Sequence, residues 1–498
     1  MASVTAEGPL RLDDRGLIAE LRDVLRAAGF DGAGVRDALG TSSEILTGSY
    51  EIPIRERRLE GQEPIGTLIK LFVLEQPVAA DAAKKALAPL SLEQLTGLGV
   101  LEENGGEVQR QVRLVPHDEI VIASDRRLGE GSDRPDHVAG VHNPSLTLSH
   151  LTVRRPIESA LDMGAGSGVQ SILAARHSDQ VVATDLNERA LNFAAFNALL
   201  NDAENVEVRA GSFYEPVAGE RFDLVTTNPP YVISPESAYL FRDSGLEGDS
   251  VSREVVRATP EHMEEGAFAT ILISWAQRPG HDWTEPLRPW IEDSGCDAWL
   301  LHHGTDDPLT HAANWNKEAY VTGPEDLGDT VDRWLAYLER LGIEGVAYGA
   351  IILRRRSGGA NWIAANELPV TRLKPAGEHI LRVFEAQDYL TGLADERELL
   401  EGTFALAPHD LLEQRVEFQD KGWVVVEASA VMQDGLGLRA GLDPVTLELL
   451  TGLDGTRKLK RVVEDQARTR RVDRGVLEGD AIGLVRGMLG AGFLTLRR

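Results

Sequence analysis

The chain has 498 residues, of which 42% are apolar and 26% charged, and its 51 basic and 79 acidic residues give a formal net charge of −28. An acidic balance of this size argues against an open, sequence-independent grip on phosphate backbones, although it leaves room for a local basic patch. The composition is that of a globular protein long enough for about three domains.

The number of cysteines and the lengths of the apolar runs indicate in which cellular compartment the protein is expected. Cys296 is the single cysteine, so no disulfide can form within the chain. The first residues lack the apolar core of a secretory signal, and no apolar run approaches the roughly 20 residues of a membrane helix. We therefore expect a cytoplasmic protein that does not bind a membrane.

Metal binding is not expected either. No group of cysteines and histidines has the spacing of a zinc site. The adjacent His302 and His303 would point to opposite faces of a strand, which is a poor arrangement for two ligands of one ion.

The N-terminal part of the chain has helical periodicity followed by a hairpin signal. Leu17, Leu21 and Leu25 are four residues apart, and Gly29 can end that helix. Further helices, the last of them in "SLEQLTGLG" at 91–99, precede short alternating strands around Asn104-Gly105-Gly106. Helices followed by a hairpin are the order of a winged helix. We predict a helical, winged-helix-like domain at 1–115 and a connector at 116–150.

Residues 151–356 alternate between strand-like and helix-like segments. The strand-like segments include "SALDM", "QVVATDL", "VEVRAG" and "FDLVTT", and helical patterns separate them. Such alternation predicts an α/β domain whose parallel sheet has helices on both faces. Ligands of such sheets bind at the carboxyl ends of the strands.

A glycine-rich turn follows the first of these strands. In "LDMGAGSGVQSI" at 161–172 the strand ends at Asp162, and Gly164, Gly166 and Gly168 form a turn before a helix. Glycine is needed where φ is positive or where a ligand approaches the backbone. The next strand ends at Asp185, whose carboxylate can accept two hydrogen bonds from a ribose diol.

The identity of the cofactor follows from the spacing of these glycines. Dinucleotide-binding turns are G-x-G-x-x-G and hold a pyrophosphate, whereas this turn is G-x-G-x-G after an acidic residue. S-adenosylmethionine has no phosphate, and its cationic methionine end favours an acidic residue such as Asp162, so we predict this cofactor. Ser212 and Phe213 follow the third strand, where they would meet the adenine amine and cover the adenine ring. The alternative for Phe213 is an ordinary core position.

"FDLVTTNPPYVISP" at 222–235 ends the fourth strand with Asn228 and two prolines, which have no use inside a sheet. The nitrogen of an amide or aromatic amine is a poor nucleophile because its lone pair is delocalised. Hydrogen-bond acceptors for both of its N–H groups would aim that lone pair. We predict that the Asn228 side chain and the rigid Pro229 carbonyl are these acceptors, and that the Tyr231 ring stacks on the target. The alternative is an ordinary Pro-Pro turn.

A boundary is expected at 354–375, where the basic run Arg354-Arg355-Arg356 is followed by glycines. Beyond it we predict a C-terminal domain at 357–498. Its last part has two helices, a third helix and a strand, and "MLGAGFLTL" repeats the pattern of the N-terminal "LTGLGVLEE". A winged-helix-like end is therefore expected here as well, for recognition of a target, for packing or for dimerisation.

The four central motifs resemble the class I S-adenosylmethionine-dependent methyltransferases of the Asn-Pro-Pro-Tyr type, over about 150–200 residues. The resemblance implies a Rossmann-like, seven-stranded methyltransferase domain. It also implies that Ala165, Leu186, Asn187 and Asn228 belong to the cofactor site. Two branches fit: the glutamine methyltransferases of release factors, which residues 243–267 resemble, and the ribosomal RNA guanine exocyclic-amine methyltransferases, which residues 140–156 resemble.

We therefore expect an N-methyltransferase that acts on an amide or exocyclic amine of a macromolecule, either a protein glutamine or an RNA base. The end domains would select the substrate and could form a homodimer. One alternative is a methyltransferase of small molecules in secondary metabolism. Another is a cofactor-binding regulator without catalysis, against which the intact Asn228 and Pro229 argue.

Overall fold

A computed structural model describes residues 8–41, 51–127, 134–237, 239–243, 245–316, 324–358, 360–368, 373–408, 410–420 and 422–497. These residues form two compact units, one of residues 1–149 and 155–366 and one of residues 150–154 and 367–498. Part of the predicted boundary at 354–375 lies outside the described residues. Within the described part of the chain, no helix has both the length and the apolar character needed to cross a bilayer.

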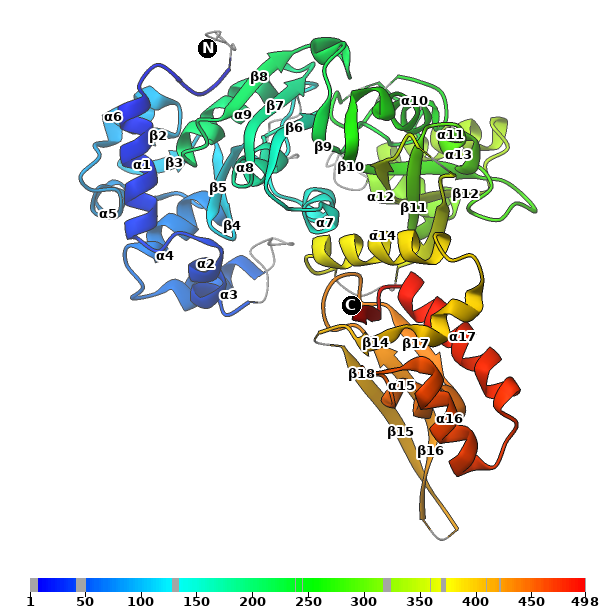
Figure 1. Cartoon of the computed structure of the whole chain (residues 1–498). Coiled ribbons are helices and arrows are strands. Elements are labelled where there is room, and N and C mark those ends of the chain that lie inside the picture. The colour runs from blue at the N-terminus through cyan, green and yellow to red at the C-terminus, as the bar shows by residue number, and fades with distance from the viewer. Residues whose placement is uncertain are drawn as a thin grey trace. The chain divides into compact units, whose positions relative to one another are not determined.

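An eight-stranded sheet is the centre of the first unit (Figure 1). Its order is β13-β11-β12-β10-β9-β6-β7-β8. The strands β6 to β10 pair in parallel, whereas β12 is antiparallel to both β10 and β11. The strands are β6 (Ile157–Met163), β7 (Ser178–Asp185), β8 (Val206–Ala210), β9 (Phe222–Thr227), β10 (Met263–Gln277), β11 (Cys296–Asp306), β12 (Gly345–Arg355) and β13 (Ile363–Glu367).

Helices cover both faces of this sheet, as the alternation of segments predicts. Consecutive residues of β7 point to opposite faces. Val182 belongs to an apolar cluster with Val255 of α10, whereas Ala183 belongs to a cluster with Leu191 of α9. The helices are α8 (Val169–Ala175), α9 (Glu188–Leu200), α10 (Ser250–Ala258), α11 (Arg288–Ile291), α12 (Pro308–Asn316) and α13 (Pro324–Arg340), with short turns η3 (Glu215–Val217) and η4 (Thr259–His262).

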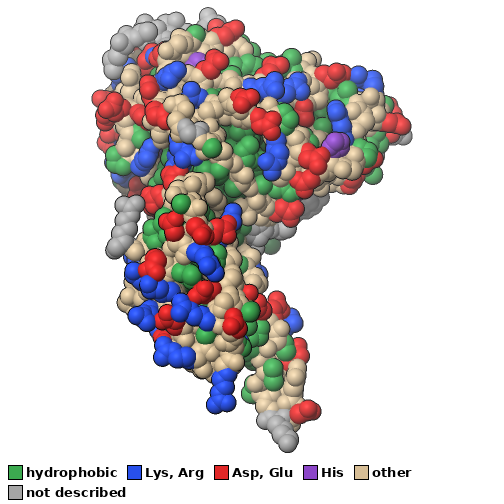
Figure 2. Space-filling view, turned by 45° about the vertical axis from the view of Figure 1, so that its right-hand side comes forward, with side chains coloured by type: hydrophobic (Ala, Val, Ile, Leu, Met, Phe, Trp, Pro, Cys, Tyr) green, Lys and Arg blue, Asp and Glu red, His purple; other side chains and the backbone are tan. Residues whose placement is uncertain are grey.

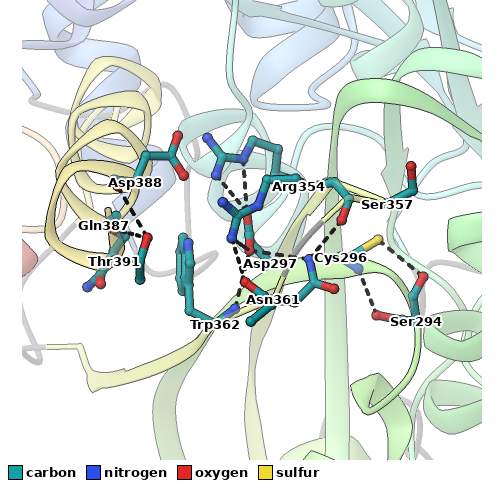
Figure 3. Close-up of polar contacts among 12 residues, drawn as sticks. Ser294, Cys296, Asp297, Arg354, Ser357, Asn361, Trp362, Gln387, Asp388 and Thr391 are labelled. Carbon is teal, nitrogen blue, oxygen red and sulfur yellow. Dashed lines mark hydrogen bonds and ion pairs between the residues drawn. The ribbon is translucent and has the colours of Figure 1, made fainter. Parts of the chain in front are cut away.

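The sheet has eight strands where seven were expected, because β13 extends it past the predicted domain end at 356. A buried carboxylate, Asp297 on β11, explains the addition (Figure 3). It accepts hydrogen bonds from Arg354 Nη2 at 2.6 Å and Arg356 Nη2 at 2.8 Å, and from the Trp362 backbone N–H, just before β13, at 3.2 Å. The segment that follows the basic run is thereby held against β11 as a further edge strand.

In the described residues of the N-terminal part, helices α1 to α4 and η2 precede strand β1, and helices α5 and α6 and the hairpin β2–β3 follow it, with a three-stranded sheet in the order β1-β3-β2. The winged-helix-like character of this region remains a prediction. A second hairpin and a helix lie within the predicted connector. The elements are α1 (Arg15–Ala27), α2 (Gly32–Leu39), α3 (Ile52–Leu59), α4 (Ile65–Leu68), η2 (Ile69–Val73), β1 (Val78–Ala79), α5 (Ala80–Ala86), α6 (Leu92–Leu98), β2 (Leu101–Asn104), β3 (Glu107–Arg110), β4 (Arg113–His117), β5 (Ile120–Ser124) and α7 (Asn143–Leu151).

Helix α9 joins this N-terminal part to the sheet. Its residues Phe193 and Phe196 belong to the same apolar core as the N-terminal helices. Two of its asparagines and the Asn201 that caps its end each donate to and accept from one backbone segment of the N-terminal part: Asn192 with Leu10, Asn197 with Ala123 and Asn201 with Val121, at 2.7–3.1 Å. A side-chain amide whose oxygen and nitrogen both bond to the same backbone segment holds that segment in a fixed position against the helix. The N-terminal part and the sheet are therefore one unit.

The second unit contains two small sheets, β18-β14-β19 and β15-β16-β17. The predicted late helices and terminal strand are present, whereas the long hairpin β15–β16 was not predicted. The elements are α14 (Gly377–Thr391), η5 (Glu396–Glu401), β14 (Thr403–Leu406), β15 (Leu411–Gln419), β16 (Gly422–Val431), β17 (Arg439–Leu442), α15 (Pro444–Thr451), β18 (Asp454–Lys458), α16 (Leu459–Arg470), α17 (Arg474–Gly490) and β19 (Leu494–Arg497).

Candidate active site

A cavity of about 190 Å³ lies at the carboxyl ends of β6, β7, β8 and β9. Ligands of parallel α/β sheets are expected at this edge. Gly168 and Tyr231, although predicted for the site, do not line the cavity. The other predicted site residues do: Asp162, Gly164, Ala165, Gly166, Asp185, Leu186, Asn187, Ser212, Phe213, Asn228 and Pro229.

The glycine turn after β6 has left-handed backbone at three positions, with φ of +70° at Gly164, +55° at Gly166 and +80° at Gly168. A Cβ atom at Gly164 or Gly166 would meet no atom within 4 Å, so these glycines leave open space. At Gly168 it would lie 3.2 Å from Ala194 on α9. Gly168 therefore serves the close packing of the turn on α9.

Asp185 at the end of β7 binds the turn from the neighbouring strand. Its Oδ2 accepts from the Gly166 N–H and its Oδ1 from the Asn187 N–H, both at 2.8 Å. Burial raises the pKa of this carboxyl above its ordinary value. Each carboxylate oxygen can accept a further bond, so the carboxylate can still receive a diol. Leu186, 62% exposed, lies on the rim.

Asn187 begins α9 and connects it to the segment before α7. Its Oδ1 accepts from the Arg189 N–H at 3.0 Å, a common N-cap bond. Its Nδ2 donates to the carbonyl of Asp136 at 2.9 Å. The same side chain thus caps a helix and fixes the chain that enters the cavity wall at His137.

Asp162 is buried at the end of β6. Its Oδ2 accepts from the Ser171 N–H at 2.9 Å and from the Ser171 hydroxyl at 2.6 Å. Burial raises the pKa of Asp162 to about 6. A cation in the cavity would stabilise the ionised form of this carboxyl and lower that pKa.

Ser212 and Phe213 follow β8 and reach the cavity together. Phe213 is 37% exposed, so it is not a core residue. Its φ of +45° is unusual for a residue other than glycine, and strained backbone of this kind concentrates at ligand sites. The next residue, Tyr214, takes the core position and stacks on His262 with ring centroids 4.5 Å apart.

The Asn-Pro-Pro-Tyr segment brings one unsatisfied polar atom to the cavity. Asn228 Oδ1 is buried and has no hydrogen-bond partner. The neighbouring Pro229 carbonyl accepts from the Tyr231 N–H at 2.7 Å, which leaves it one lone pair. A buried acceptor without a partner costs free energy, and such an atom calls for an explanation such as an absent ligand.

Tyr231 lies beside the cavity. Its ring packs against an apolar cluster that contains Val232, Ala312 and Trp334. Its backbone carbonyl accepts from the Ser274 hydroxyl, and burial raises the pKa of its phenol to about 12. The predicted stacking of Tyr231 on a target group remains a prediction.

Two walls of the cavity come from segments that the sequence reasoning did not assign to it. The first precedes β6 and contributes residues from His137 to Leu148. Within it burial lowers the pKa of His142, and the Nδ1 atom of this histidine is 2.8 Å from the Gly140 carbonyl oxygen. The second is the loop after Tyr231, which contributes Leu240 and Phe241. Residues 140–148 of the first wall lie in the segment 140–156 that resembles the RNA branch, whereas Leu240 and Phe241 precede the segment 243–267 that resembles the glutamine branch, so no stated resemblance covers the second wall.

A buried ion pair holds the second wall. Arg242 and Asp243 make two parallel bonds at 2.8 and 2.9 Å, and their side chains are 5% and 0% exposed. Arg242 also donates to the Trp315 carbonyl at 3.0 Å, and Asp243 accepts from the Ser234 hydroxyl at 2.9 Å. Arg242 directly follows Phe241 in the chain. The ion pair therefore holds this cavity wall in place and has no direct part in the chemistry.

Metal ligation has no candidate among the residues that the structure describes, because no three His, Cys, Asp or Glu side chains converge there. The site thus consists of carboxylates, backbone turns and an amide acceptor around a largely apolar cavity.

Residues 143–265 match the methyltransferase small domain family. Strands β6 to β9, with the cavity at their carboxyl ends, therefore belong to an S-adenosylmethionine-dependent methyltransferase domain, as the four motifs indicated. Residues 27–111 and 381–496 each match a domain of unknown function.

Among curated proteins, the chain is similar to a release factor glutamine methyltransferase of Xylella fastidiosa, with 34% identity over 145 residues, 26% of this chain and 50% of that protein. It is also similar to a ribosomal protein uL3 glutamine methyltransferase of Bradyrhizobium diazoefficiens, with 35% identity over 159 residues, 29% of this chain and 48% of that protein. The chain spans about half the length of these relatives. A solved structure, Trm5b of Pyrococcus abyssi, aligns with a TM-score of 0.30 and 15% identity over 51% of this chain and 62% of that chain.

Proposed function

We propose that this chain is an S-adenosylmethionine-dependent N-methyltransferase whose acceptor is the side-chain amide of a glutamine in a protein. The observation that carries the proposal is the buried Asn228 Oδ1, which lines the cavity without a hydrogen-bond partner. A primary amide has two N–H donors. Asn228 Oδ1 and the Pro229 carbonyl can accept one each and so orient the amide nitrogen toward the cofactor.

The cavity has groups suited to each part of the cofactor. Asp185 would accept from the ribose hydroxyls, and Ser212 with Phe213 would hold the adenine. The open faces of Gly164 and Gly166 leave room for the ligand to approach the backbone. Asp162 would face the cationic methionine end. When bound, the cofactor supplies a methyl group on a positively charged sulfur.

Four residues of this chain would act at the acceptor. Asn228 and Pro229 would hold both N–H groups and so aim the nitrogen lone pair at the methyl carbon, so that the carbon–nitrogen bond can form as the carbon–sulfur bond breaks and one N–H proton then leaves to solvent. The apolar Leu240 and Phe241 would keep water out of the cavity. No general base is required of the chain, because the amide nitrogen loses its proton readily once it carries the methyl group.

A protein acceptor is favoured over RNA because the arginines of the longest basic run make their bonds within the fold. The longest basic run, Arg354-Arg355-Arg356, is used inside the fold: Arg354 and Arg356 bind Asp297, and Arg355 donates to the Ser294 carbonyl at 2.6 Å. Backbone binding needs free positive charge. The curated relatives named above carry protein glutamine substrates in their names.

The test is methyl transfer from labelled S-adenosylmethionine to a lysate that is then divided into protein, RNA and small-molecule fractions. We expect label in the protein fraction, located by mass spectrometry on a glutamine side chain. The Asn228→Ala variant is the matched control that should leave that glutamine unmodified. Label in RNA or in small molecules alone would contradict the proposal, and label in no fraction, with the cofactor bound, would favour the regulator.

A further inference from the structure

The hydroxyl group of Tyr348 on β12 joins two side chains of helix α12. It contacts Nδ1 of His311, and it accepts from Nε1 of Trp315 at 2.9 Å. The other ring nitrogen of His311, Nε2, lies 2.8 Å from the carbonyl oxygen of Ile233, two residues after the Asn-Pro-Pro-Tyr segment. We call Tyr348, His311 and Trp315 the Tyr348 network. It links β12 and α12 to the chain that leaves the candidate active site.

The donor and the acceptor in each of these bonds follow from the chemistry of the groups. The Ile233 carbonyl can only accept, so Nε2 of His311 carries a proton and donates. Burial lowers the pKa of His311 to about 4, so the ring is neutral at pH 7 and Nδ1 is an acceptor. Burial raises the pKa of the Tyr348 phenol, which therefore keeps its proton and donates to Nδ1. The network thus fixes one tautomer of His311.

Burial distinguishes the Tyr348 network from the polar contacts of the surface. Figure 2 shows acidic and basic side chains interspersed on the visible face, and exposed ion pairs of that kind contribute little because water screens them. His311, in contrast, is 0% exposed. Its hydrogen bonds are made away from water, where they are stronger and where a polar atom that loses its partner is costly. The network therefore holds its members in one arrangement.

Helix α12 holds the loop after the Asn-Pro-Pro-Tyr segment at both ends. His311 binds the first part of the loop at Ile233, and the Trp315 carbonyl accepts from Arg242 Nη1 at 3.0 Å in the last part. The two apolar residues of the second cavity wall lie between these points. Because the Tyr348 hydroxyl bonds to both helix side chains, its removal would disturb both attachments.

The Tyr348 network comes from a part of the chain beyond the four central motifs. The match to the methyltransferase small domain family ends at residue 265, whereas the three members lie at positions 311, 315 and 348. The turns that would bind the cofactor follow β6, β7 and β8, on the other side of the Asn-Pro-Pro-Tyr segment in the sheet order. Loss of the network should therefore affect the acceptor side of the cavity first.

We propose that the Tyr348 network positions the methyl acceptor. It acts through the Ile233 carbonyl, five residues after Asn228, and the two prolines between them restrict how the backbone can adjust. The Asn228 oxygen is thereby held where it can receive the acceptor N–H, and a misplacement of about 1 Å at such a group can cost about a hundredfold in rate. This inference rests on the proposed function, which assigns the acceptor amide to Asn228.

Two pairs of variants of the full chain test the inference. Tyr348→Phe removes one oxygen and keeps the ring. Its matched control is Tyr337→Phe on α13, whose hydroxyl accepts from the Gly248 N–H at 2.9 Å, outside the loop of residues 231–243. In the second pair, His311→Gln keeps an N–H group that can donate to the Ile233 carbonyl, whereas His311→Leu has none.

Three measurements are made on each variant. Calorimetry gives the affinity for S-adenosylmethionine and the fraction of molecules that bind it. The initial rate of label transfer to the protein fraction of a cell lysate, measured against the concentration of that fraction, gives an apparent KM and an apparent kcat per cofactor-binding molecule. Nitrogen-15 NMR of chain labelled at histidine reports which ring nitrogen of His311 carries the proton, and the signal is identified by its loss in His311→Gln.

We expect Tyr348→Phe to lower the apparent kcat about tenfold to a hundredfold, with cofactor affinity unchanged. Tyr337→Phe should behave as the unaltered chain, and His311→Gln should keep more of the kcat than His311→Leu. A purely structural role would instead lower the fraction of molecules that bind the cofactor and leave the kcat of the remainder unchanged. In the unaltered chain the proton should lie on Nε2 of His311, and in Tyr348→Phe the Nδ1 signal should shift because this atom loses its donor.

An apparent kcat of Tyr348→Phe equal to that of the unaltered chain would overturn the inference. So would equal losses in Tyr348→Phe and Tyr337→Phe, equal losses in the two His311 variants, or a proton on Nδ1 of His311. Failure of the proposed function would look different, because the label would then enter RNA or small molecules. The NMR signals, and the same comparison of rates in the labelled fraction, would still decide whether the Tyr348 network positions the acceptor.

Discussion

Asn228 is the residue on which the chemistry depends. Its Oδ1 is buried without a hydrogen-bond partner, as is Thr184 Oγ1 in the same cavity lining, whereas the carboxylates of Asp162 and Asp185 already accept two or more N–H or O–H groups each. A preorganised acceptor that waits for its donor stabilises the transition state without having to reorganise. The carboxylates, in contrast, shape the turn and can bind the cofactor at the same time.

Replacing Asn228 should separate catalysis from cofactor binding. Asn228→Ala removes one acceptor and should reduce turnover about a hundredfold to a thousandfold. Cofactor affinity, measured by calorimetry on the same preparation, should not change. Asn228→Asp keeps an acceptor oxygen in the same place, so its loss of turnover should be smaller than that of Asn228→Ala if only the position of the acceptor matters. Near-normal turnover in Asn228→Ala, or a parallel loss of affinity and folding, would leave the segment as an ordinary Pro-Pro turn.

Asp162 should make cofactor binding depend on pH. Its pKa of about 6 in the folded chain lies above the unperturbed value of about 3.9, so without a ligand the proton is retained up to pH 6. Between pH 4 and pH 6, therefore, the folded chain binds more protons at Asp162 than the unfolded chain does. The contribution of Asp162 to the free energy of unfolding declines as the pH rises from about 4 to 6. The cationic cofactor needs the ionised form, so affinity should rise as pH rises through about 6.

Calorimetric titration of the cofactor between pH 5 and 7.5 measures this effect. Asp162→Asn should bind more weakly at pH 7.5 and should lose most of the rise with pH. Burial also raises the pKa of Asp185, so the part that remains in the variant is assigned to Asp185. An unchanged pH profile in Asp162→Asn would exclude Asp162 as the partner of the cation.

At the scale of elements, the loop after the Asn-Pro-Pro-Tyr segment is held by the Arg242–Asp243 pair. The Arg242 guanidinium also lies over the rings of Tyr239 and Trp334, at 5.2 and 5.6 Å from their centroids. The Arg242 side chain therefore makes an ion pair with Asp243, two cation–π contacts and a hydrogen bond to the Trp315 carbonyl. Arg242 is therefore a central anchor of the loop that carries Leu240 and Phe241, beside the bond from the Leu240 N–H to the Pro135 carbonyl at 3.1 Å and the ring contact between Phe241 and His137.

Removing that anchor should loosen the cavity wall. Arg242→Ala leaves the Asp243 carboxylate buried without its cation, which costs about 3–5 kcal/mol for a pair of this kind. We expect faster hydrogen exchange across residues 234–243 and a higher KM for the acceptor, with cofactor affinity less affected. Arg340→Ala, which removes an exposed ion pair with Glu247 at 2.8 Å, is the control and should change neither. Protection of the loop in Arg242→Ala equal to that of the unaltered chain would contradict the anchoring role.

At the scale of the whole molecule, the division of the chain decides which fragments can fold. Residues 1–149 and 155–366 form one unit, and α9 supplies both apolar residues and asparagines to its N-terminal part. A fragment of residues 140–356 would expose Phe193 and Phe196 and remove the Leu10, Val121 and Ala123 backbone partners of Asn192, Asn201 and Asn197. A fragment of residues 1–368 keeps all of these contacts and retains β13.

We therefore expect the fragment of residues 1–368 to fold and to bind S-adenosylmethionine as the full chain does, but to lose its preference for the protein substrate. The fragment of residues 140–356 should be largely unfolded. Circular dichroism checks whether each fragment folds, and calorimetry checks whether residues 1–368 bind the cofactor. Competition between the protein substrate and a short glutamine peptide checks the substrate preference. Methylation of the protein substrate by residues 1–368 at the rate of the full chain would exclude a role of the C-terminal unit in recognition.

The sequence by itself determined the parallel α/β core, the methyltransferase class and eleven of the residues that line the cavity, all of them at the ends of strands β6 to β9. These signals are local: glycines that require positive φ, acidic residues at strand ends and prolines that cannot continue a sheet each act within a few residues. The eighth strand, the shared core of α9, the cavity walls at His137–Leu148 and Leu240–Phe241, and the long β15–β16 hairpin were decided by the tertiary structure. They depend on contacts between distant segments, such as the 182 residues that separate Leu10 from Asn192, and on strand register, neither of which a local pattern contains.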